Sequence, residues 1–387
     1  MFNAFINTGI DMFFVELLGP KKVVKMRSNN SEIIFEKIKS VNNPNSMHGI
    51  YPYRGKISAI DAANIIRQLP REGVILDPFC GSGTIVYEGQ KHGLTAYGVD
   101  NNPLAVTLAR AKVHKEVKNS LEECRHFIEL AKKDLETGDY EAMPEGAAKS
   151  FHEDSAKEIM CMKKNFEDMN DFLKGIFYGA IALTARGCNG YIWTSSTVGK
   201  NIEPKRYINF FEKMESKTKK HSAYLNDLAL PDATIIHGDS RRISDYIKPH
   251  SINYVFTSPP YFDGLDYTAY YGKLVYDIFE RDRIEIKKQL IQYVDTYEDD
   301  MRAVLEQLDI VTKEDALIIF VVGDKKVKGG VINGGEFFNN IKEASYIEER
   351  SYSGSSSQVF DVLNKTDRKE QIVVWDKCKG EIIKHGI

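Results

Sequence analysis

Several features that would place the chain in a special class of proteins are missing from its sequence. Its 387 residues include five cysteines, but no two of them form a Cys-X-X-Cys pair, so the sequence offers neither a zinc motif nor an even disulfide framework. This cysteine usage favours a reducing, cytoplasmic compartment. Residues 2–18 are apolar in places, yet they carry Asp11 and Glu16 and lack a basic leader. We therefore expect neither a signal peptide nor a membrane span there.

The chain also lacks a strong net charge, which is −3 at pH 7. Bulk electrostatics therefore do not predict a polyanion-binding protein, and any surface for nucleic acid must be a local patch. Three basic clusters are candidates for such a patch, namely residues 21–27, 215–221 and 325–330. Each cluster is also typical of an ordinary solvent-exposed face, and the three would form one binding surface only if they lay close together in the fold.

What the chain does contain is an alternation of strand and helix patterns in two blocks, which is typical of a parallel α/β sheet. The first block predicts a helix, a strand, a helix, a strand and a helix, in that order, at 60–69, 74–76, 84–91, 95–99 and 102–113. The second predicts a strand in "ATIIHGDS", strands at 252–256 and 316–322, a helix near 297–308, and two more strands in "SYIEERSYS" and "QIVVWD".

A long stretch of helical periodicity separates the two blocks. We therefore expect one sheet domain made of residues 46–114 and 231–387, with a mainly helical insertion at 115–230. Residues 1–45 end in a polar connector and are expected to form an N-terminal extension.

A glycine-rich turn joins the first predicted strand to the helix that follows it. In "VILDPFCGSGT" (74–84), Gly81 and Gly83 would let the backbone approach a ligand closely at the carboxyl end of a parallel strand. A phosphate loop is excluded because Gly83 is followed by Thr84 and not by a lysine. A dinucleotide fingerprint would need a third glycine where Val86 stands. The alternative is a helix start that merely needs small residues.

An acidic residue, Asp100, closes the next predicted strand, "AYGVD". A carboxylate at this position can accept hydrogen bonds from both hydroxyls of a ribose. Asp100 or Asn101 could instead cap the helix that begins near Asn102. With the glycine-rich turn, Asp100 favours a cofactor that carries a nucleoside without a pyrophosphate.

A second motif, "TSPPY" (257–261), follows the buried strand pattern at 252–256. Two consecutive prolines end a strand and hold the next carbonyls in one geometry, because each proline fixes φ and removes a backbone donor. Such rigidity indicates a functional site, although a rigid exit from the strand with Tyr261 packed against it would use the same residues.

The pair "DPFCGSGT" and "TSPPY" resembles the S-adenosylmethionine-dependent DNA methyltransferases that modify N4 of cytosine or N6 of adenine, over about residues 47–114 and 233–325. The resemblance implies an α/β fold, a Rossmann-like class I methyltransferase sheet of seven mostly parallel strands with a mainly helical insertion. It also implies S-adenosyl-L-methionine as the cofactor and makes the sheet domain the catalytic domain.

The resemblance assigns the cofactor-binding residues one by one. The turn would hold the methionine part, Asp100 the ribose and Asp239 the adenine. A segment resembling "YPYRGKIS" (51–58) covers the methionine end in the family. The expected cofactor-binding residues are Tyr53, Asp77, Phe79, Gly81, Gly83, Asp100, Asn101, Asp239 and Thr257.

The expected catalytic residues are Ser258, Pro259, Pro260 and Tyr261. An exocyclic amine is a poor nucleophile, and the Ser258 hydroxyl and the Pro259 carbonyl would accept from its hydrogens as positive charge develops. Tyr261 would stack on a base flipped out of the duplex. In the family, a serine that opens this tetrapeptide is associated with cytosine N4 and an aspartate or asparagine with adenine N6. We therefore expect N4-methylcytosine, although many serine-bearing members place the tetrapeptide before the turn.

The expected partner is double-stranded DNA, with residues 115–230 as its target-recognition region and "CNGYIWTSSTVGKN" (188–201) as a loop able to reach base edges. A companion restriction endonuclease is a further possible partner, and no metal is expected. Methylation at cytosine carbon 5 is excluded because the chain has no Pro-Cys pair to supply a nucleophile. An RNA (tRNA) amino-methyltransferase and a catalytically dead nucleic-acid-binding module are the alternatives.

Overall fold

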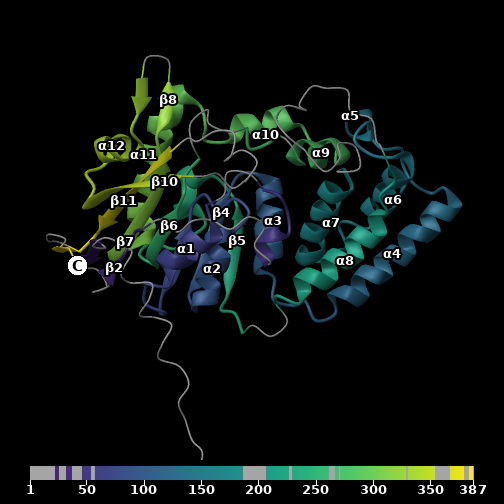
Figure 1. Cartoon of the computed structure of the whole chain (residues 1–387), viewed down its shortest axis with the longest axis horizontal. Coiled ribbons are helices and arrows are strands. Elements are labelled where there is room, and N and C mark those ends of the chain that lie inside the picture. Colours follow the sequence, from purple (N-terminus) through teal and green to yellow (C-terminus); the bar gives the residue numbers. More distant parts are fainter. Residues whose placement is uncertain are drawn as a thin grey trace, which may run out of the picture.

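The computed structural model describes residues 22–25, 32–36, 46–53, 57–185, 206–225, 229–260, 266–269, 271–327, 330–353, 367–378 and 383–386. Some strand residues at the edges of these ranges are described by their backbone alone. Figure 1 shows a twisted sheet flanked by helices, with a group of further helices to one side.

The sheet has seven strands in the order β10-β11-β7-β6-β3-β4-β5. Its members are β3 (Val74–Asp77), β4 (Thr95–Asp100), β5 (Ala233–His237), β6 (Ile252–Thr257), β7 (Thr312–Gly323), β10 (Tyr346–Ser353) and β11 (Asp367–Asp376). Neighbouring strands from β5 to β7 pair in parallel, whereas β11 is antiparallel to both β7 and β10. Six strands thus share one direction, which confirms the predicted seven-stranded, mostly parallel, Rossmann-like sheet.

Both faces of this sheet are buried, as a central parallel sheet requires. Successive residues of a strand point to opposite faces, so Ile75 and Phe256 belong to one apolar core while their neighbours Leu76 and Val255 belong to the other. The first core includes residues of α1 (Ala59–Ile66), α2 (Thr84–His92) and α3 (Pro103–Val113), and the second includes residues of α11 (Val294–Val311) and α12 (Gly334–Ile341).

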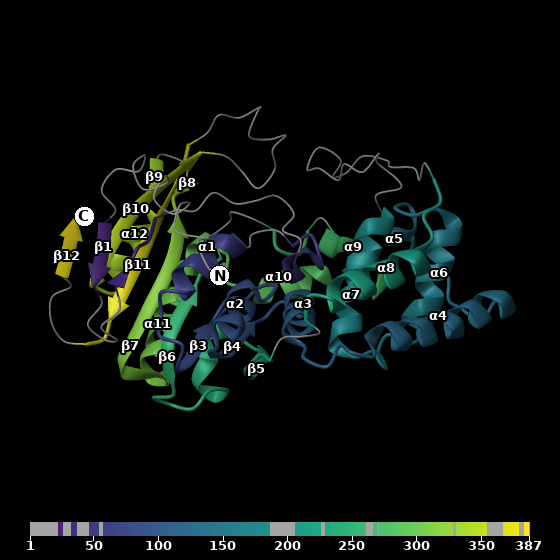
Figure 2. The same ribbon diagram turned by 60° about the horizontal axis from the view of Figure 1, so that its bottom comes forward.

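Among the described residues between α3 and β5, the chain forms five helices: α4 (Ser120–Thr137), α5 (Glu145–Ala148), α6 (Glu153–Lys163), α7 (Asp171–Thr184) and α8 (Phe210–Ser222). Figures 1 and 2 place them beside the sheet, beyond α3. The contact with α3 is close, because a Cβ added to Gly175 of α7 would lie 2.3 Å from the Ala111 Cβ atom. The fold therefore includes the predicted mainly helical insertion.

The smaller elements frame the sheet. A three-stranded sheet joins β1 (Lys22–Lys25) to β2 (Glu32–Ile33) and to β12 (Ile383–Gly386), so the predicted N-terminal extension pairs with a strand near the other end of the chain. The remaining elements are η1 (Met47–Gly49), η4 (Ser240–Asp245), α9 (Tyr271–Ile278), α10 (Arg283–Gln289) and the hairpin of β8 (Lys325–Val327) and β9 (Gly330–Ile332).

A buried cation ties the chain before residue 46 to the edge of the main sheet. The Arg350 guanidinium donates to the Phe35 carbonyl at 3.0 Å and to the Asp61 carboxylate, and it also contacts Glu370. Removing one partner of such a buried pair is costly because it leaves a charge without compensation. This cluster fixes α1 and β10 relative to one another.

For the strands and helices that the sequence predicts, the observed first and last residues agree closely with the predicted ones. The clearest differences are that α11 begins at Val294 and β7 extends over Thr312–Gly323, while α9, α10 and α12 were not anticipated. Among the described residues, no helix combines the length and the apolar character that crossing a bilayer requires.

Candidate active site

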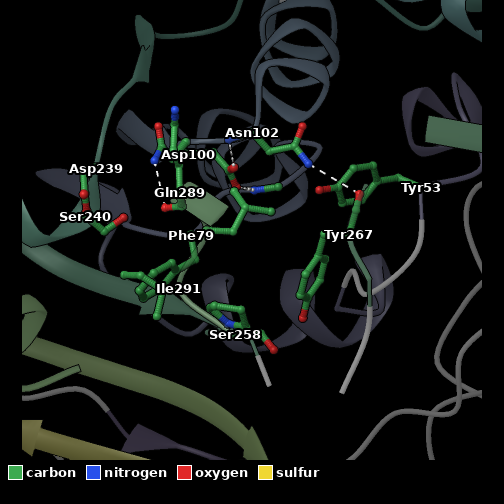
Figure 3. Close-up of a pocket in the computed structure, with 14 residues that line it drawn as sticks. Tyr53, Phe79, Asp100, Asn102, Asp239, Ser240, Ser258, Tyr267, Gln289 and Ile291 are labelled. Carbon is green, nitrogen blue, oxygen red and sulfur yellow. Dashed lines mark hydrogen bonds between the residues drawn. The ribbon is translucent and has the colours of Figure 1, made fainter. Parts of the chain in front are cut away.

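A cavity opens at the carboxyl ends of β3, β4 and β6, and the empty space at this opening, with the adjoining solvent included, is about 620 Å³. This is the edge at which parallel sheets bind ligands. Figure 3 shows the side chains that point into it. The residues that line the cavity are Tyr53, Phe79, Gly81, Asp100, Asn101, Asn102, Asp239, Ser240, Ser258, Pro260, Tyr267, Gln289, Leu290 and Ile291.

The glycine-rich turn folds back onto the end of β4. The Gly81 N–H donates to Asp100 Oδ2 at 2.8 Å, and the Cys80 N–H donates to the Val99 carbonyl at 3.0 Å. Gly81 has a φ of +50°, and a Cβ there would lie 3.3 Å from the Tyr53 ring. A side chain at this position would therefore strain the backbone and crowd Tyr53.

The second glycine of the turn has a different environment. Gly83 has a φ of +75° and precedes α2, and a Cβ added to it would lie 3.0 Å from the Ala109 Cα atom of α3. Gly83 does not line the cavity. The structure thus explains this glycine by the close packing of α2 against α3, and its contact with the cofactor stays a prediction.

The Asp100 carboxylate is held in place by backbone donors. Its Oδ1 accepts from the Asn102 N–H and its Oδ2 from the Gly81 N–H, both at 2.8 Å. Burial raises the pKa of the Asp100 carboxyl to about 6, although these two N–H groups oppose that shift. Each carboxylate oxygen has a second acceptor position. The group can therefore accept from two vicinal hydroxyls of a ligand in the cavity.

Asp77 and Thr257 lie behind the cavity and not on its wall. The Thr257 hydroxyl donates to Asp77 Oδ1 at 2.6 Å, and the Phe79 N–H donates to the same oxygen at 3.1 Å. Burial raises the pKa of the Asp77 carboxyl to about 7. The pair joins the end of β3 to the end of β6, so it positions the glycine-rich turn beside "TSPPY".

Asp239 follows β5 and lines the cavity together with Ser240. Its carboxylate accepts from the Arg241 guanidinium at 2.6 Å, and Arg241 also donates to Asp300 at 2.7 Å. Burial alone would raise the pKa of Asp239, but the hydrogen bonds from Arg241 outweigh it and hold the pKa below its ordinary value. Asp239 is thus a fixed anion at this end of the cavity.

The predicted catalytic tetrapeptide leaves β6 at the cavity. Ser258 and Pro260 line it, Pro259 is buried, and Tyr261 lies outside the described residues. The buried Tyr297 of α11 donates its hydroxyl to the Pro260 carbonyl at 2.5 Å. This bond fixes the backbone just beyond Ser258.

Among the described residues of the wall, sequence reasoning missed six: Asn102, Ser240, Tyr267, Gln289, Leu290 and Ile291. Asn102 had a signal, because an asparagine two residues after Asp100 is a helix cap, and it does cap α3. It also accepts from the Tyr276 hydroxyl at 2.5 Å and donates to the Tyr267 carbonyl at 3.4 Å. Residues 289–291 carry no motif, and only the path of the chain brings them to the cavity.

The chemistry of this wall fits S-adenosylmethionine. The carboxylate of Asp100 suits a ribose, the apolar side chains of Phe79 and Ile291 suit an adenine ring, and the absence of a side chain at Gly81 leaves room for the methionine part. Among the described residues, no group of histidine, cysteine, aspartate and glutamate is arranged to hold a metal ion.

Comparisons with known proteins agree with this site. Residues 55–314 match the family model of the D12 class N6 adenine-specific DNA methyltransferases. The chain is 25% identical over 329 residues to Type II methyltransferase M.MvaI of Kocuria varians, covering 78% of this chain and 63% of that relative, so it spans less than two thirds of the relative's length. It is 23% identical over 415 residues to Type II methyltransferase M.MjaII of Methanocaldococcus jannaschii, covering 76% and 75%.

Two solved structures are similar at a greater distance. The putative rRNA-methylase from Clostridium thermocellum has 10% identity and a TM-score of 0.31, covering 82% of this chain and 98% of its own. A SAM-dependent methyltransferase from Agrobacterium tumefaciens has 8% identity and a TM-score of 0.35, covering 96% and 76%.

The family model covers more than half of the chain and contains both the glycine-rich turn and "TSPPY". The strand order and the cavity stand beside that match as independent observations. The chain is therefore a member of the D12 class N6 adenine-specific DNA methyltransferase family, and S-adenosylmethionine is its cofactor.

Proposed function

We propose that the protein transfers the methyl group of S-adenosylmethionine to the exocyclic amine of a flipped-out base in double-stranded DNA, with N4 of cytosine as the target. The observation that carries this proposal is that Ser258 shares one cavity with Asp100 and Gly81. A base held at Ser258 would therefore face the cofactor without a covalent intermediate on the enzyme.

The bound cofactor supplies an electrophilic methyl group on its sulfonium. Residues of this chain make the amine reactive, since the Ser258 hydroxyl and the Pro259 carbonyl accept from its two hydrogens and stabilise the positive charge that develops. The Tyr297 hydroxyl holds the Pro260 carbonyl, so this end of β6 is preorganised. Most of the acceleration then comes from orientation, and the surplus proton leaves through Ser258 to solvent.

The identity of the base rests on Ser258. A serine at the first position of the tetrapeptide is associated with cytosine N4 in amino-methyltransferases of this kind, which supports cytosine. The family description supports adenine N6 as the second candidate. A hydroxyl can accept from either amine, so pocket chemistry alone does not separate the two.

We also propose that the catalytic domain consists of residues 46–114 and 231–387, and that the insertion at 115–230 is the target-recognition region. Gly146 of α5 supports this, because a Cβ added to it would lie 3.2 Å from Asp277 of α9, a helix in the chain that leaves "TSPPY". This proximity of the insertion to a helix that follows the tetrapeptide in the chain supports the proposal. The base-edge loop at 188–201 lies outside the described residues, and a companion endonuclease stays a prediction.

The experiment is a methylation reaction with isotope-labelled S-adenosylmethionine and either duplex DNA or RNA, followed by digestion to nucleosides and mass spectrometry. The proposal expects label in N4-methyldeoxycytidine. Label only in N6-methyldeoxyadenosine would select the second candidate, and label only in RNA would reject DNA as the substrate. Exchanging residues 115–230 for those of a relative should change the sequence preference; an unchanged preference would reject the role of the insertion.

A further inference from the structure

Asp266 collects four hydrogen bonds a few residues after "TSPPY". Its carboxylate accepts from the N–H of Thr268 at 2.9 Å and from the Thr268 hydroxyl at 2.6 Å. It also accepts from the Arg283 guanidinium at 3.0 Å and from the Lys287 ammonium at 3.1 Å. One side chain thus ties its own segment to two cations of a helix that follows α9.

That helix, α10, is held only in part by apolar packing. None of its seven residues, Arg283–Gln289, is buried, although the partly buried Ile286 packs against the first apolar core, and a helix of this length is not stable by itself. Polar ties therefore contribute to its position. Figure 1 shows α10 lying across the molecule between the sheet and α9.

The far end of α10 runs into the cofactor cavity. Gln289, Leu290 and Ile291 form part of its wall, and Figure 3 shows Gln289 and Ile291 pointing into it. The Asn101 side chain donates to the Gln289 carbonyl at 3.1 Å. A displacement of α10 would therefore remove the apolar wall that faces Phe79.

The chain from Asp266 to Tyr297 begins and ends on the base-binding side. Asp266 follows the tetrapeptide, and Tyr297 returns to hold the Pro260 carbonyl. Between them lie α10 and the cofactor wall. Asp266 is 27% exposed and Arg283 is 31% exposed, so this network is partly desolvated. Such a network is worth more than an isolated surface ion pair.

We propose that Asp266 is a positioning residue that latches α10 over the cofactor cavity and so couples the chain leaving "TSPPY" to cofactor binding. Asp266 acts through α10 and does not touch the reacting atoms. The inference rests on the proposed function, because it takes Ser258 and its neighbours as the base-binding side. It adds a link between that side and the cofactor wall through residues that lie outside both the glycine-rich turn and "TSPPY".

The test compares Asp266→Asn with Asp245→Asn. Asp245 pairs with Arg242 on η4 at 2.8 Å, and both side chains are exposed and outside the cavity wall. Calorimetry should give about tenfold weaker binding of S-adenosylmethionine for Asp266→Asn, within the usual range of coupling effects, and unchanged binding for Asp245→Asn. The KM for the cofactor should rise by a similar factor, while kcat at saturating cofactor changes little. Melting temperatures should differ by no more than a few degrees, because the Asp266 network is partly exposed.

A double variant distinguishes a role of Asp266 that acts through α10 from a nonspecific disturbance of the structure. If Asp266 acts through Arg283, then Asp266→Asn and Arg283→Gln together should weaken binding no more than Asp266→Asn alone. If Asp266→Asn fails to fold, the double variant Arg283→Gln/Lys287→Gln takes its place, because it removes both cations that donate to Asp266. Cofactor affinity equal to that of Asp245→Asn, or effects of Asp266 and Arg283 that simply multiply, would overturn the latch. Failure of the wild-type protein to bind the cofactor would instead overturn the site itself.

Discussion

The two sides of the cavity differ in where their supporting residues come from in the chain. On the cofactor side, Asp100 is held by the N–H groups of Gly81 and Asn102, all within the continuous stretch of chain from β3 to α3. On the proposed base side, the Pro260 carbonyl is held by Tyr297 of α11. The ties that hold Asp100 are therefore encoded locally, whereas the tie on the proposed base side depends on a chain segment that must first fold and return.

This difference predicts that the two sides can be damaged separately. Variants on the base side should lose methyl transfer and keep cofactor affinity, and variants on the cofactor side should do the reverse.

The largest effect is expected for Ser258→Ala. Removing one preorganised group that stabilises developing charge typically costs on the order of 100-fold in rate, so single-turnover methyl transfer should fall by about that factor while cofactor affinity stays the same. Ser251→Ala is the matched control, because Ser251 stands at the opposite end of β6 and donates to the Lys248 carbonyl. A wild-type transfer rate in Ser258→Ala would remove Ser258 from the mechanism.

The next effect concerns Asp100→Ala. Hydrogen bonds to a charged group contribute about 2 kcal/mol, so the dissociation constant for S-adenosylmethionine should rise by roughly 30-fold. Calorimetry on the folded variant measures this directly. Unchanged affinity would show that the carboxylate does not hold the ribose.

Cofactor binding should also depend on pH through Asp100. Burial raises its pKa to about 6 from an ordinary 3.8, so the carboxyl gains a proton as the pH falls through 6 and loses acceptor capacity for the ribose hydroxyls. Affinity should be constant above pH 6 and fall by up to about tenfold per unit below it. Folding stability has the opposite pH dependence, since the stability that this group contributes is lost as the pH rises from about 4 to 6.

The Asp100→Asn variant is the control for this pH dependence. Asp77, whose pKa burial raises to about 7, titrates nearby but does not line the cavity. If the fall in affinity persists unchanged in Asp100→Asn, Asp77 or another group is responsible and the assignment to Asp100 is wrong.

The smallest effect is expected for Tyr297→Phe. This change removes the hydrogen bond to the Pro260 carbonyl and keeps the ring, so it should cost about 1 kcal/mol, or roughly fivefold in transfer rate. Cofactor affinity should be unchanged. Tyr246→Phe is the control, because Tyr246 is 40% exposed. Equal rates in the two variants would show that Tyr297 does not position the tetrapeptide.

The same contrast explains what could be predicted from the sequence. The sheet was predictable because β3, β4, β6 and β7 are apolar runs between recognisable turns and helices. Gly81 and Asp100 were predictable because Asp100 closes β4 and Gly81 lies in the turn after the neighbouring parallel strand β3, so their approach is a local consequence of the topology. The roles of Asp77 and Gly83 were less predictable from the sequence. Asp77 contacts Thr257 and Gly83 packs against Ala109, and both contacts depend on which strands and helices become neighbours in the fold.

The other wall of the cavity could not be predicted from a pattern. Gln289, Leu290 and Ile291 follow a short exposed helix that has no periodicity to distinguish it from a loop. Their approach to Asp100 results from ties between residues far apart in the chain, such as that of Asn101 with the Gln289 carbonyl. Pairings of this kind are decided by the tertiary fold and leave no local signal.

The separation of the two sides is tested most directly by single-turnover methyl transfer at saturating S-adenosylmethionine, measured side by side for Ser258→Ala and Asp100→Ala. The account predicts that Asp100→Ala recovers a rate within a few-fold of wild type once the cofactor is saturating, whereas Ser258→Ala remains on the order of 100-fold slower at any cofactor concentration. A rate that recovers in Ser258→Ala, or one that stays equally low in both variants, would contradict it.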